Sequence, residues 1–189
     1  MTTPTAQGIG TFGGMGDNAN EQFSGSQVAD TNAIPVLRIV AKNVRGLKTD
    51  ERIHELITEL KTTKTWDIVI LTETWRVDEM EMFATNEGHL FANAGCEAGR
   101  RGVGFLVHRR WTKFLLSFVP INERVATLTL RKHKFKVQIV GVYFPHCGYS
   151  DECVQQVYDI LTNVLHEART SKDHVVIAGD FNAEVGKKR

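Results

Sequence analysis

The stretch 67–75, DIVILTETW, decides the fold of this chain. Its apolar run at 68–71 shows no alternation with polar residues, which predicts a strand buried on both faces. Strands of this kind occur where other layers cover both sides of a sheet. The polar residues that follow the run end the strand and place side chains at one rim of the sheet.

The residues before this strand predict a strand and a helix. Residues 36–44 are mostly apolar and predict a buried strand. Thr49 and Asp50 suit a helix start. The helix that follows carries apolar residues at the i, i+3, i+4, i+7 spacing of one face: Ile53, Leu56, Ile57 and Leu60. Together these segments form a strand, helix, strand unit.

The residues after it predict more strands and a second helix. A Gly-rich and Arg-containing loop at 95–104 leads into a strand at 103–108, and 124–130 with 135–144 predicts an antiparallel hairpin with one solvated face. A second helix begins near Ser150. We expect its apolar stripe to consist of Val154, Val157, Tyr158, Leu161, Leu165 and Ala168, and a last buried strand to span 174–180. This mixture favours a layered α/β sandwich over a purely parallel sheet.

The first 34 residues differ from the rest of the chain. They contain no Lys or Arg, three acidic residues and many Gly, Thr, Ser and Asn. So few large apolar side chains cannot offset the entropy of ordering the segment. We therefore predict a disordered tail at 1–34 and a folded domain at 35–189.

Composition and charge exclude several classes of protein. The 189 residues are 42% hydrophobic and 24% charged, and the net charge is +1. Without the three acids of the tail, 23 basic and 19 acidic residues leave +4, which permits a polyanionic substrate without proving one. Three Cys without an even framework, no membrane-length apolar run and no signal peptide predict an intracellular, non-secreted protein with no disulfide partner. A nuclear location stays open.

Polar residues end four of the predicted strands, where side chains converge at one rim of a sheet. They are Asn43, Glu73, Tyr143 and Asp180, with Asn182 two residues on. Singly, each has a plain structural explanation: a turn former, a surface acid or an aromatic at the edge of the core. Together, the amide and carboxylate oxygens are ligands that Mg²⁺ takes, and a carboxylate beside the ion could activate water.

Five motifs occur in an order that resembles a known family. They are KNVRGL at 42–47, DIVILTETW at 67–75, GRRGVGFLV at 99–107, VQIVGVYFP at 137–145 and HVVIAGDFNAEVG at 174–186. Each motif is weak, but in this order they are similar to the endonuclease/exonuclease/phosphatase family of Mg²⁺-dependent phosphodiesterases. Within it, the chain most resembles the endonuclease domains of non-LTR retrotransposons and the craniofacial development protein 2-like sequences derived from them.

The resemblance implies a fold and roles for the site residues. The fold is a four-layer α/β/β/α sandwich. Asn43 and Glu73 match the metal site, with Glu73 as principal ligand, and the metal is Mg²⁺ or, as a possible substitute, Mn²⁺. Tyr143 matches the tyrosine at the scissile phosphate, Asp180 the residue that orients the water, and Asn182 the one that holds the phosphate. DNA is the expected partner, with no membrane association.

Departures from the family pattern also matter. Lys42 replaces a usual Trp, and Arg45 stands where repair-type members carry an acid. His146 replaces an amide residue near the phosphate. The family completes its site with a late Asp-His pair, which is absent before Arg189. We therefore expect a C-terminally truncated domain that lacks the last strands of the second sheet and full catalytic competence.

The basic loop residues Arg100 and Arg101 are further candidates for nucleic-acid contact, together with the stretch 109–111, RRW; a solvated loop is an equal alternative. Three functions follow from these observations. The first is a DNA endonuclease similar to those of retrotransposons. The second is a non-catalytic remnant that binds nucleic acid or protein. The third is a phosphodiesterase or phosphatase acting on phosphoinositide, sphingomyelin or poly(A). The oligomeric state is left open.

Overall fold

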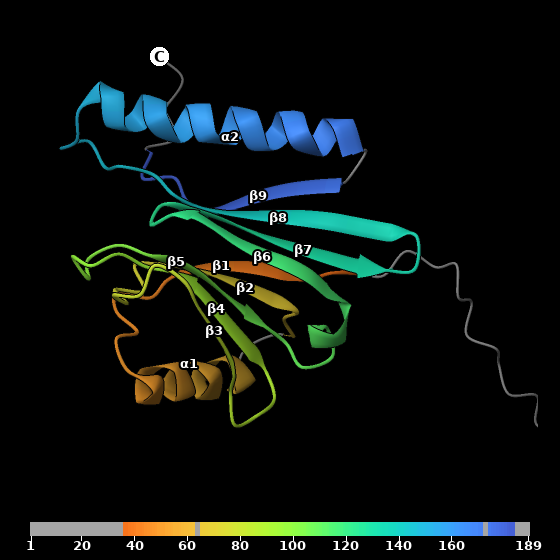
Figure 1. Cartoon of the computed structure of the whole chain (residues 1–189). Helices are drawn as coiled ribbons and strands as arrows, with labels where there is room; N and C mark the ends of the chain where they lie inside the picture. The colour runs from red at the N-terminus through yellow and green to blue at the C-terminus, as the bar shows by residue number, and fades with distance from the viewer. Residues whose placement is uncertain (1–35, 63–64, 172–173, 184–189) are drawn as a thin grey trace, which may run out of the picture. The chain divides into compact units, whose positions relative to one another are not determined.

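The described part of the chain forms two packed β-sheets with a helix on the outside of each (Figure 1). The computed structural model describes residues 36–62, 65–171 and 174–183. The predicted disordered tail at 1–34 lies outside these residues and stays a prediction.

Sheet A has the strand order β1-β2-β5-β4-β3. Strands β1 and β2 are parallel, and α1 connects them; the other neighbours are antiparallel. The bounds are β1 Ile39–Asn43, α1 Asp50–Thr62, β2 Ile68–Thr72, β3 Glu81–Ala84, β4 Leu90–Ala94 and β5 Val103–Val107.

Sheet B has the order β6-β7-β8-β9. Its first three strands are antiparallel, and α2 connects β8 to the parallel strand β9. The bounds are β6 Leu115–Asn122, β7 Val125–Lys132, β8 Phe135–Tyr143, α2 Asp151–Ser171 and β9 His174–Asp180, with a short 3₁₀ helix at Thr112–Phe114. Neither α1 nor α2, the two α-helices of the described residues, is long and apolar enough to cross a membrane.

Three apolar clusters separate the layers. The central cluster fills the space between the sheets, with Ile70, Phe105 and Leu128 among its fully buried side chains. A second lies between α1 and sheet A, and a third between α2 and sheet B. The order of layers is therefore α1, sheet A, sheet B, α2, as Figure 1 shows. The predicted α/β/β/α sandwich is confirmed.

Several local predictions are confirmed. The four apolar residues predicted for the first helix are all buried in α1, and every residue of β2 is buried. The second helix also forms, but Val164 takes a buried place in its stripe and Tyr158 is exposed. Tyr158 instead makes an edge-to-face contact with the ring of Phe144.

Three predictions of burial were wrong. The first and last strands were expected to be fully buried, but β1 and β9 are the edge strands of their sheets and are only partly covered. The hairpin β7-β8 was expected to have one solvated face, but α2 covers that face with the third cluster. Strands β3, β4 and β6 were not predicted, because short or Pro-containing segments show weak periodicity.

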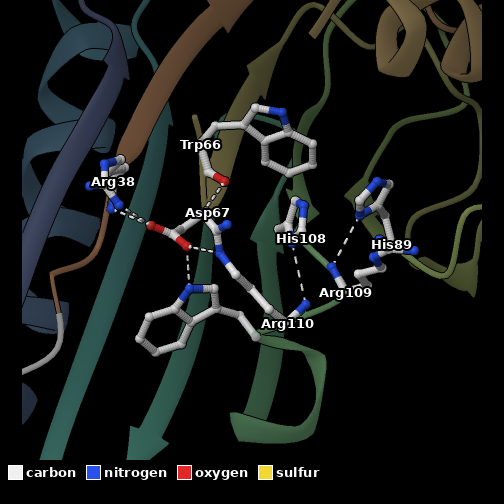
Figure 2. A network of polar contacts seen from close by, with 8 residues as sticks. Arg38, Trp66, Asp67, His89, His108, Arg109 and Arg110 are labelled. Carbon is white, nitrogen blue, oxygen red and sulfur yellow. Dashed lines mark hydrogen bonds and ion pairs between the residues drawn. The ribbon is translucent and has the colours of Figure 1, made fainter. Parts of the chain in front are cut away.

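A buried carboxylate organises the end of β2 that lies farthest from Glu73 (Figure 2). Asp67 is 1% exposed and accepts hydrogen bonds from the backbone N–H of Arg38, from Arg110 Nε at 2.6 Å and from Trp111 Nε1. Burial opposes its ionisation, but these donors outweigh burial and hold the Asp67 pKa below its usual value. Trp111 is 5% exposed and packs in the core, so it presents no open face on which a base could stack, whereas Arg110 stays partly exposed while it binds Asp67.

Two histidines beside this network are held neutral. His89 Nδ1 accepts the backbone N–H of Arg109 at 3.0 Å, and His108 Nδ1 accepts that of Arg110 at 3.3 Å. Their rings lie 4.7 Å apart, and both contact Trp66. Burial, followed by the nearby charge of His108, lowers the His89 pKa to about 4.

We predict that stability falls on acidification. Because His89 has a lower pKa folded than unfolded, its contribution is complete above about pH 6.5 and is lost as the pH falls towards 4. The free energy of unfolding, measured by urea denaturation across this range, is expected to fall by about 2–3 kcal/mol from His89. His89→Asn keeps an acceptor for the Arg109 N–H but cannot titrate, so it should flatten the profile. An equal pH dependence in both proteins would contradict the prediction.

Candidate active site

Parallel strand pairs bring four polar residues to one end of the sandwich. Asn43 ends β1, and Glu73 follows directly after its parallel neighbour β2. In the other sheet, Tyr143 ends β8 and Asp180 ends β9, where the two residues are register partners. The carboxyl ends of parallel strands meet at the same edge, so each sheet contributes two side chains.

Hydrogen bonds join these four side chains. Asn43 Nδ2 donates to Glu73 Oε1 at 2.8 Å and to Asp180 Oδ2 at 3.0 Å, which links sheet A to sheet B. The Tyr143 hydroxyl donates to Glu73 Oε1 at 3.3 Å. The structure therefore brings Asn43, Glu73, Tyr143 and Asp180 together as one cluster of direct contacts.

The backbone around the cluster adopts uncommon conformations. Glu73 has φ 58° and Arg45 has φ 46°, both in the left-handed region that non-glycine residues rarely occupy. The Glu73 carbonyl accepts the N–H of Gly46 at 2.8 Å, and the Thr72 carbonyl accepts that of Val44 at 3.0 Å. These bonds tie the loop after β1 to the end of β2 and set the position of the Glu73 side chain.

Asn182 lies beside the cluster. Its backbone N–H donates to Asp180 Oδ1 at 3.0 Å, and its Nδ2 donates to the Phe144 carbonyl at 2.7 Å. Asn182 thus holds the Asp180 carboxylate and the end of β8, while its amide oxygen has no hydrogen bond among the described residues. It also has a positive φ, 45°.

A pocket of about 390 Å³ opens beside the cluster, on the side of β1 and β9. It is lined by Ala41, Lys42, Asn43, Thr72, Gly179, Asp180, Phe181, Asn182 and Ala183. The Thr72 hydroxyl is buried and has no hydrogen-bond partner among the described residues. A polar pocket with an unsatisfied hydroxyl and a carboxylate is suited to hydrated or charged ligands.

The Tyr143 phenol is held in its neutral form. Burial and the negative charge of Glu73 raise the Tyr143 pKa above its ordinary value. The guanidinium of Arg124 lies 5.5 Å from the ring centroid and donates to the Tyr143 carbonyl at 3.3 Å. The hydroxyl therefore remains a hydrogen-bond donor at neutral pH.

Arg124 is a functional candidate that sequence reasoning missed. It is 7% exposed, and the described residues place no carboxylate within 4.0 Å of its guanidinium. That group also lies over the ring of Tyr149, 4.8 Å from its centroid. The only signal in the sequence was its position directly before the apolar strand at 125–130. The other site residues lie at the opposite, carboxyl ends of their strands.

The other residues predicted to contact the substrate are not part of this cluster, and they differ in exposure. Arg101 pairs with Glu123 at 2.6 Å and lies 5.6 Å from the Tyr149 centroid. A hydrogen bond from Arg101, and then its charge, holds the Tyr149 pKa below its ordinary value. His146 is exposed, and its Nδ1 accepts the backbone N–H of Gly148 at 3.0 Å.

Arg45 and Arg100 are both exposed. The backbone N–H of Arg45 donates to Asn43 Oδ1 at 3.2 Å, so Arg45 touches the cluster through its main chain. Arg100 lies in the loop before β5, next to Arg101. The structure therefore brings four of the predicted residues into direct contact and leaves the side chains of Arg45 and Arg100 exposed.

The donor set of the cluster fits a hard divalent cation. Glu73, Asp180 and Asn43 offer carboxylate and amide oxygens, which Mg²⁺ binds in combination with water. Glu73 Oε2 has no hydrogen-bond donor among the described residues, since Asn43 and Tyr143 both bind Oε1. Within 36–62, 65–171 and 174–183, no three His, Cys, Asp or Glu side chains cluster as ligands, so a bound ion would use few protein groups.

Comparisons with known proteins show the family and the fold of the chain. The family model described as the Endonuclease/Exonuclease/phosphatase family matches residues 40–186. Solved structures with the same fold include an AP endonuclease from Archaeoglobus fulgidus, with TM-score 0.53 and 18% identity over 78% of this chain and 58% of that one. A humanized TDP2 of D. rerio gives TM-score 0.52 and 18% identity over 79% and 67%.

The endonuclease domain of TRAS1, a telomere-specific non-LTR retrotransposon, gives TM-score 0.47 and 15% identity over 79% of this chain and 60% of that one. No curated protein matches the chain significantly. Because the family model spans most of its length, the chain belongs to the endonuclease/exonuclease/phosphatase family. It spans 58% of the length of the archaeal enzyme.

We predict that Gly179→Ala disrupts the site and the fold around it. A Cβ at Gly179 would lie 2.0 Å from the Val142 carbonyl oxygen, so β9 would have to move away from β8 next to Asp180. The expected loss in urea unfolding is about 3 kcal/mol or more. Gly88→Ala is the matched control: it also has a positive φ, but its Cβ would meet nothing closer than 3.8 Å. Equal losses in both variants would refute the steric explanation.

Proposed function

We propose that this protein is a Mg²⁺-dependent phosphodiesterase that cleaves DNA. One observation carries the proposal: Asn43, Glu73, Tyr143 and Asp180, from four separate strands, meet in direct hydrogen-bond contact at one end of the sandwich. The donor set suits Mg²⁺, and Mn²⁺ is the natural substitute. Membership of the family supports hydrolysis of a phosphate ester as the reaction class.

Each residue has a role that follows from its contacts. Glu73 and Asn43 would hold the ion, whose charge would stabilise negative charge on the phosphate and its leaving oxygen. Tyr143 stays protonated and donates its hydrogen bond towards a phosphate oxygen. Asp180, fixed by Asn43 and Asn182, accepts the proton of the attacking water. The Asn182 amide nitrogen, which has a second N–H besides the one donated to the Phe144 carbonyl, would donate to a phosphate oxygen.

The basic residues around the cluster favour a polyanionic substrate. Arg124 is nearly buried and without a carboxylate partner in the described residues, so a phosphate would supply the missing counter-charge. The exposed Arg45, whose backbone N–H contacts Asn43, adds positive charge beside the cluster. Arg100 is also exposed, and the charge of its neighbour Arg101 is paired with Glu123. The archaeal structure with the same fold is an AP endonuclease, which supports a nucleic acid over a phosphoinositide or sphingomyelin as the substrate.

One observation favours the alternative of a nucleic-acid-binding module without catalysis. The cluster contains no histidine, and His146, three residues after Tyr143, is exposed with its Nδ1 accepting the backbone N–H of Gly148. A general acid for the leaving oxygen is therefore not supplied by the described residues. The two candidates differ in whether the chain cleaves what it binds.

We predict that the full 189-residue chain nicks supercoiled DNA in Mg²⁺. Glu73→Gln and Asp180→Asn preserve shape and remove one charge each, and are expected to reduce the nicking rate by about a hundredfold or more. Agarose-gel assays of plasmid relaxation measure this rate. If the wild type binds DNA but does not nick it, the proposed nuclease activity would be contradicted and the alternative of a non-catalytic binding module would be supported.

Lys113→Gln provides a control for the same assay that also changes the net charge by one unit, with the opposite sign. Lys113 lies in the 3₁₀ helix, where it contacts Phe114 and is remote in sequence from every cluster residue. Its nicking rate should equal that of the wild type. A similar loss in Lys113→Gln and Glu73→Gln would show that the assay reports general damage to the protein.

Metal binding gives a second test that does not depend on turnover. We predict that Mn²⁺, followed by electron paramagnetic resonance, binds the wild type and that Glu73→Gln weakens binding at least about tenfold, because the carboxylate ligand loses its charge. Tyr143→Phe should retain Mn²⁺ affinity, since the phenol donates a proton rather than a lone pair. Unchanged affinity in Glu73→Gln would exclude Glu73 as a ligand.

A further inference from the structure

A separate pocket begins two residues beyond Glu73. It has a volume of about 270 Å³ and is lined by Lys48, Trp75, Arg76, Val77, Asp78, Glu97, Ala98 and Gly99. Trp75 is the large aromatic side chain of this lining and is partly exposed, whereas Trp66 and Trp111 are 6% and 5% exposed. None of the roles given to the catalytic cluster uses this pocket.

The backbone holds Trp75 in an unusual conformation. Its φ is 58°, which is rare for a bulky residue. Its N–H donates to the Arg101 carbonyl at 2.7 Å, and the Leu47 N–H donates to the neighbouring Thr74 carbonyl at 2.7 Å. The indole packs against Gly46, where a Cβ would lie 2.8 Å from the ring. Neighbouring segments thus fix the ring in place, as is common where backbone strain serves function.

The pocket walls are also preformed. The Gly95 N–H donates to the Asp78 carbonyl at 3.0 Å, and the Cys96 N–H donates to the Arg76 carbonyl at 3.2 Å. A Cβ at Gly95 would approach the Arg76 carbonyl oxygen to 2.3 Å, so only glycine permits this close contact. A ligand would therefore enter a site that needs little rearrangement.

The charges of the pocket favour a neutral, flat ligand over a free phosphate. The Arg76 guanidinium is neutralised by Glu81 and by Asp50, which it contacts directly. Asp78 and Glu97 add negative charge to the lining. The Lys48 ammonium lies over the Trp75 ring, 5.8 Å from its centroid, so a flat ligand that stacks there would displace this flexible side chain towards a phosphate attached to the ligand.

We propose that this pocket receives an unpaired nucleobase of the substrate, stacked on Trp75, with Lys48 against its phosphate. The volume accommodates one base, and stacking on an aromatic side chain is a sequence-tolerant way to hold a base outside a duplex. The proposal rests on the proposed function, because it takes nucleic acid as the substrate, and it adds that the protein holds a base displaced next to the cleaved bond.

Tryptophan fluorescence tests this without any cleavage. In EDTA, the full chain is titrated with a short single-stranded oligodeoxynucleotide, with a chain of the same length made only of abasic sugar-phosphate units, and with a blunt duplex. The single strand should quench the emission, because a base stacks on the most exposed of the three indoles. The abasic chain and the duplex should not. No quenching by the single strand, or equal quenching by the abasic chain, would overturn the proposal.

Variants assign the effect to the pocket. Trp75→Leu should weaken single-strand binding roughly fivefold to a hundredfold, measured by anisotropy of a labelled oligonucleotide, whereas Trp75→Phe should keep most of the affinity because it keeps a ring. Lys48→Gln should reduce the slope of log affinity against log salt by about 0.7. Equal affinity in Trp75→Leu and wild type would contradict stacking on Trp75.

If Trp75→Leu fails to fold, the quenching of the wild type and the retained affinity of Trp75→Phe still decide the question. The outcome is also independent of the catalytic proposal. Quenching without nicking would support base binding at Trp75 and contradict the proposed nuclease activity. Nicking without quenching would support the nuclease activity and contradict base binding at Trp75.

Discussion

One amide joins the two halves of this molecule at its functional end. Asn43 donates from a single nitrogen to Glu73 in its own sheet and to Asp180 in the other. Two carboxylates in such proximity repel each other, and the shared amide offsets part of that cost. The remaining negative charge is the feature that suits the divalent cation of our proposal. The bond also requires the ends of β1 and β9 to lie close together, which the central apolar cluster between the sheets provides.

A second carboxylate, that of Asp67, lies at the opposite end of β2 and has a structural role. Asp67 is fully buried, yet donors from Arg38, Arg110 and Trp111 satisfy its oxygens, and the result is a fixed structural anchor (Figure 2). Glu73, at the other end of the same strand, keeps one oxygen without a protein donor among the described residues. A single strand is therefore flanked by a fully hydrogen-bonded carboxylate that stabilises the fold and by a partly bonded one to which we assign the metal.

Periodicity predicted the elements whose environment is set locally. The apolar stripe of α1 predicted a helix because it must bury one face, and the continuous apolar run of β2 predicted a strand because it must bury both. Neither inference depends on which elements pack against these segments. The same reasoning was wrong for β1, whose place at the edge of sheet A depends on pairing with β2 alone. It was also wrong for the outer face of β7, because α2, far along the chain, covers it. Arg124 and Trp75 were not predicted as site residues because their candidate roles depend on contacts with residues that are distant in the sequence.

The sequence by itself determined the α/β class, the strand ends that carry polar groups and, through five ordered motifs, the resemblance to a family that the comparison then showed. These features are local, or depend only on order along the chain. The tertiary structure alone decided that Asn43 bridges residues 30 and 137 positions away, that Arg124 lies buried against Tyr143, and that Trp75 lines a pocket. Contacts between distant segments arise from sheet register and layer packing, and no short stretch of sequence encodes either.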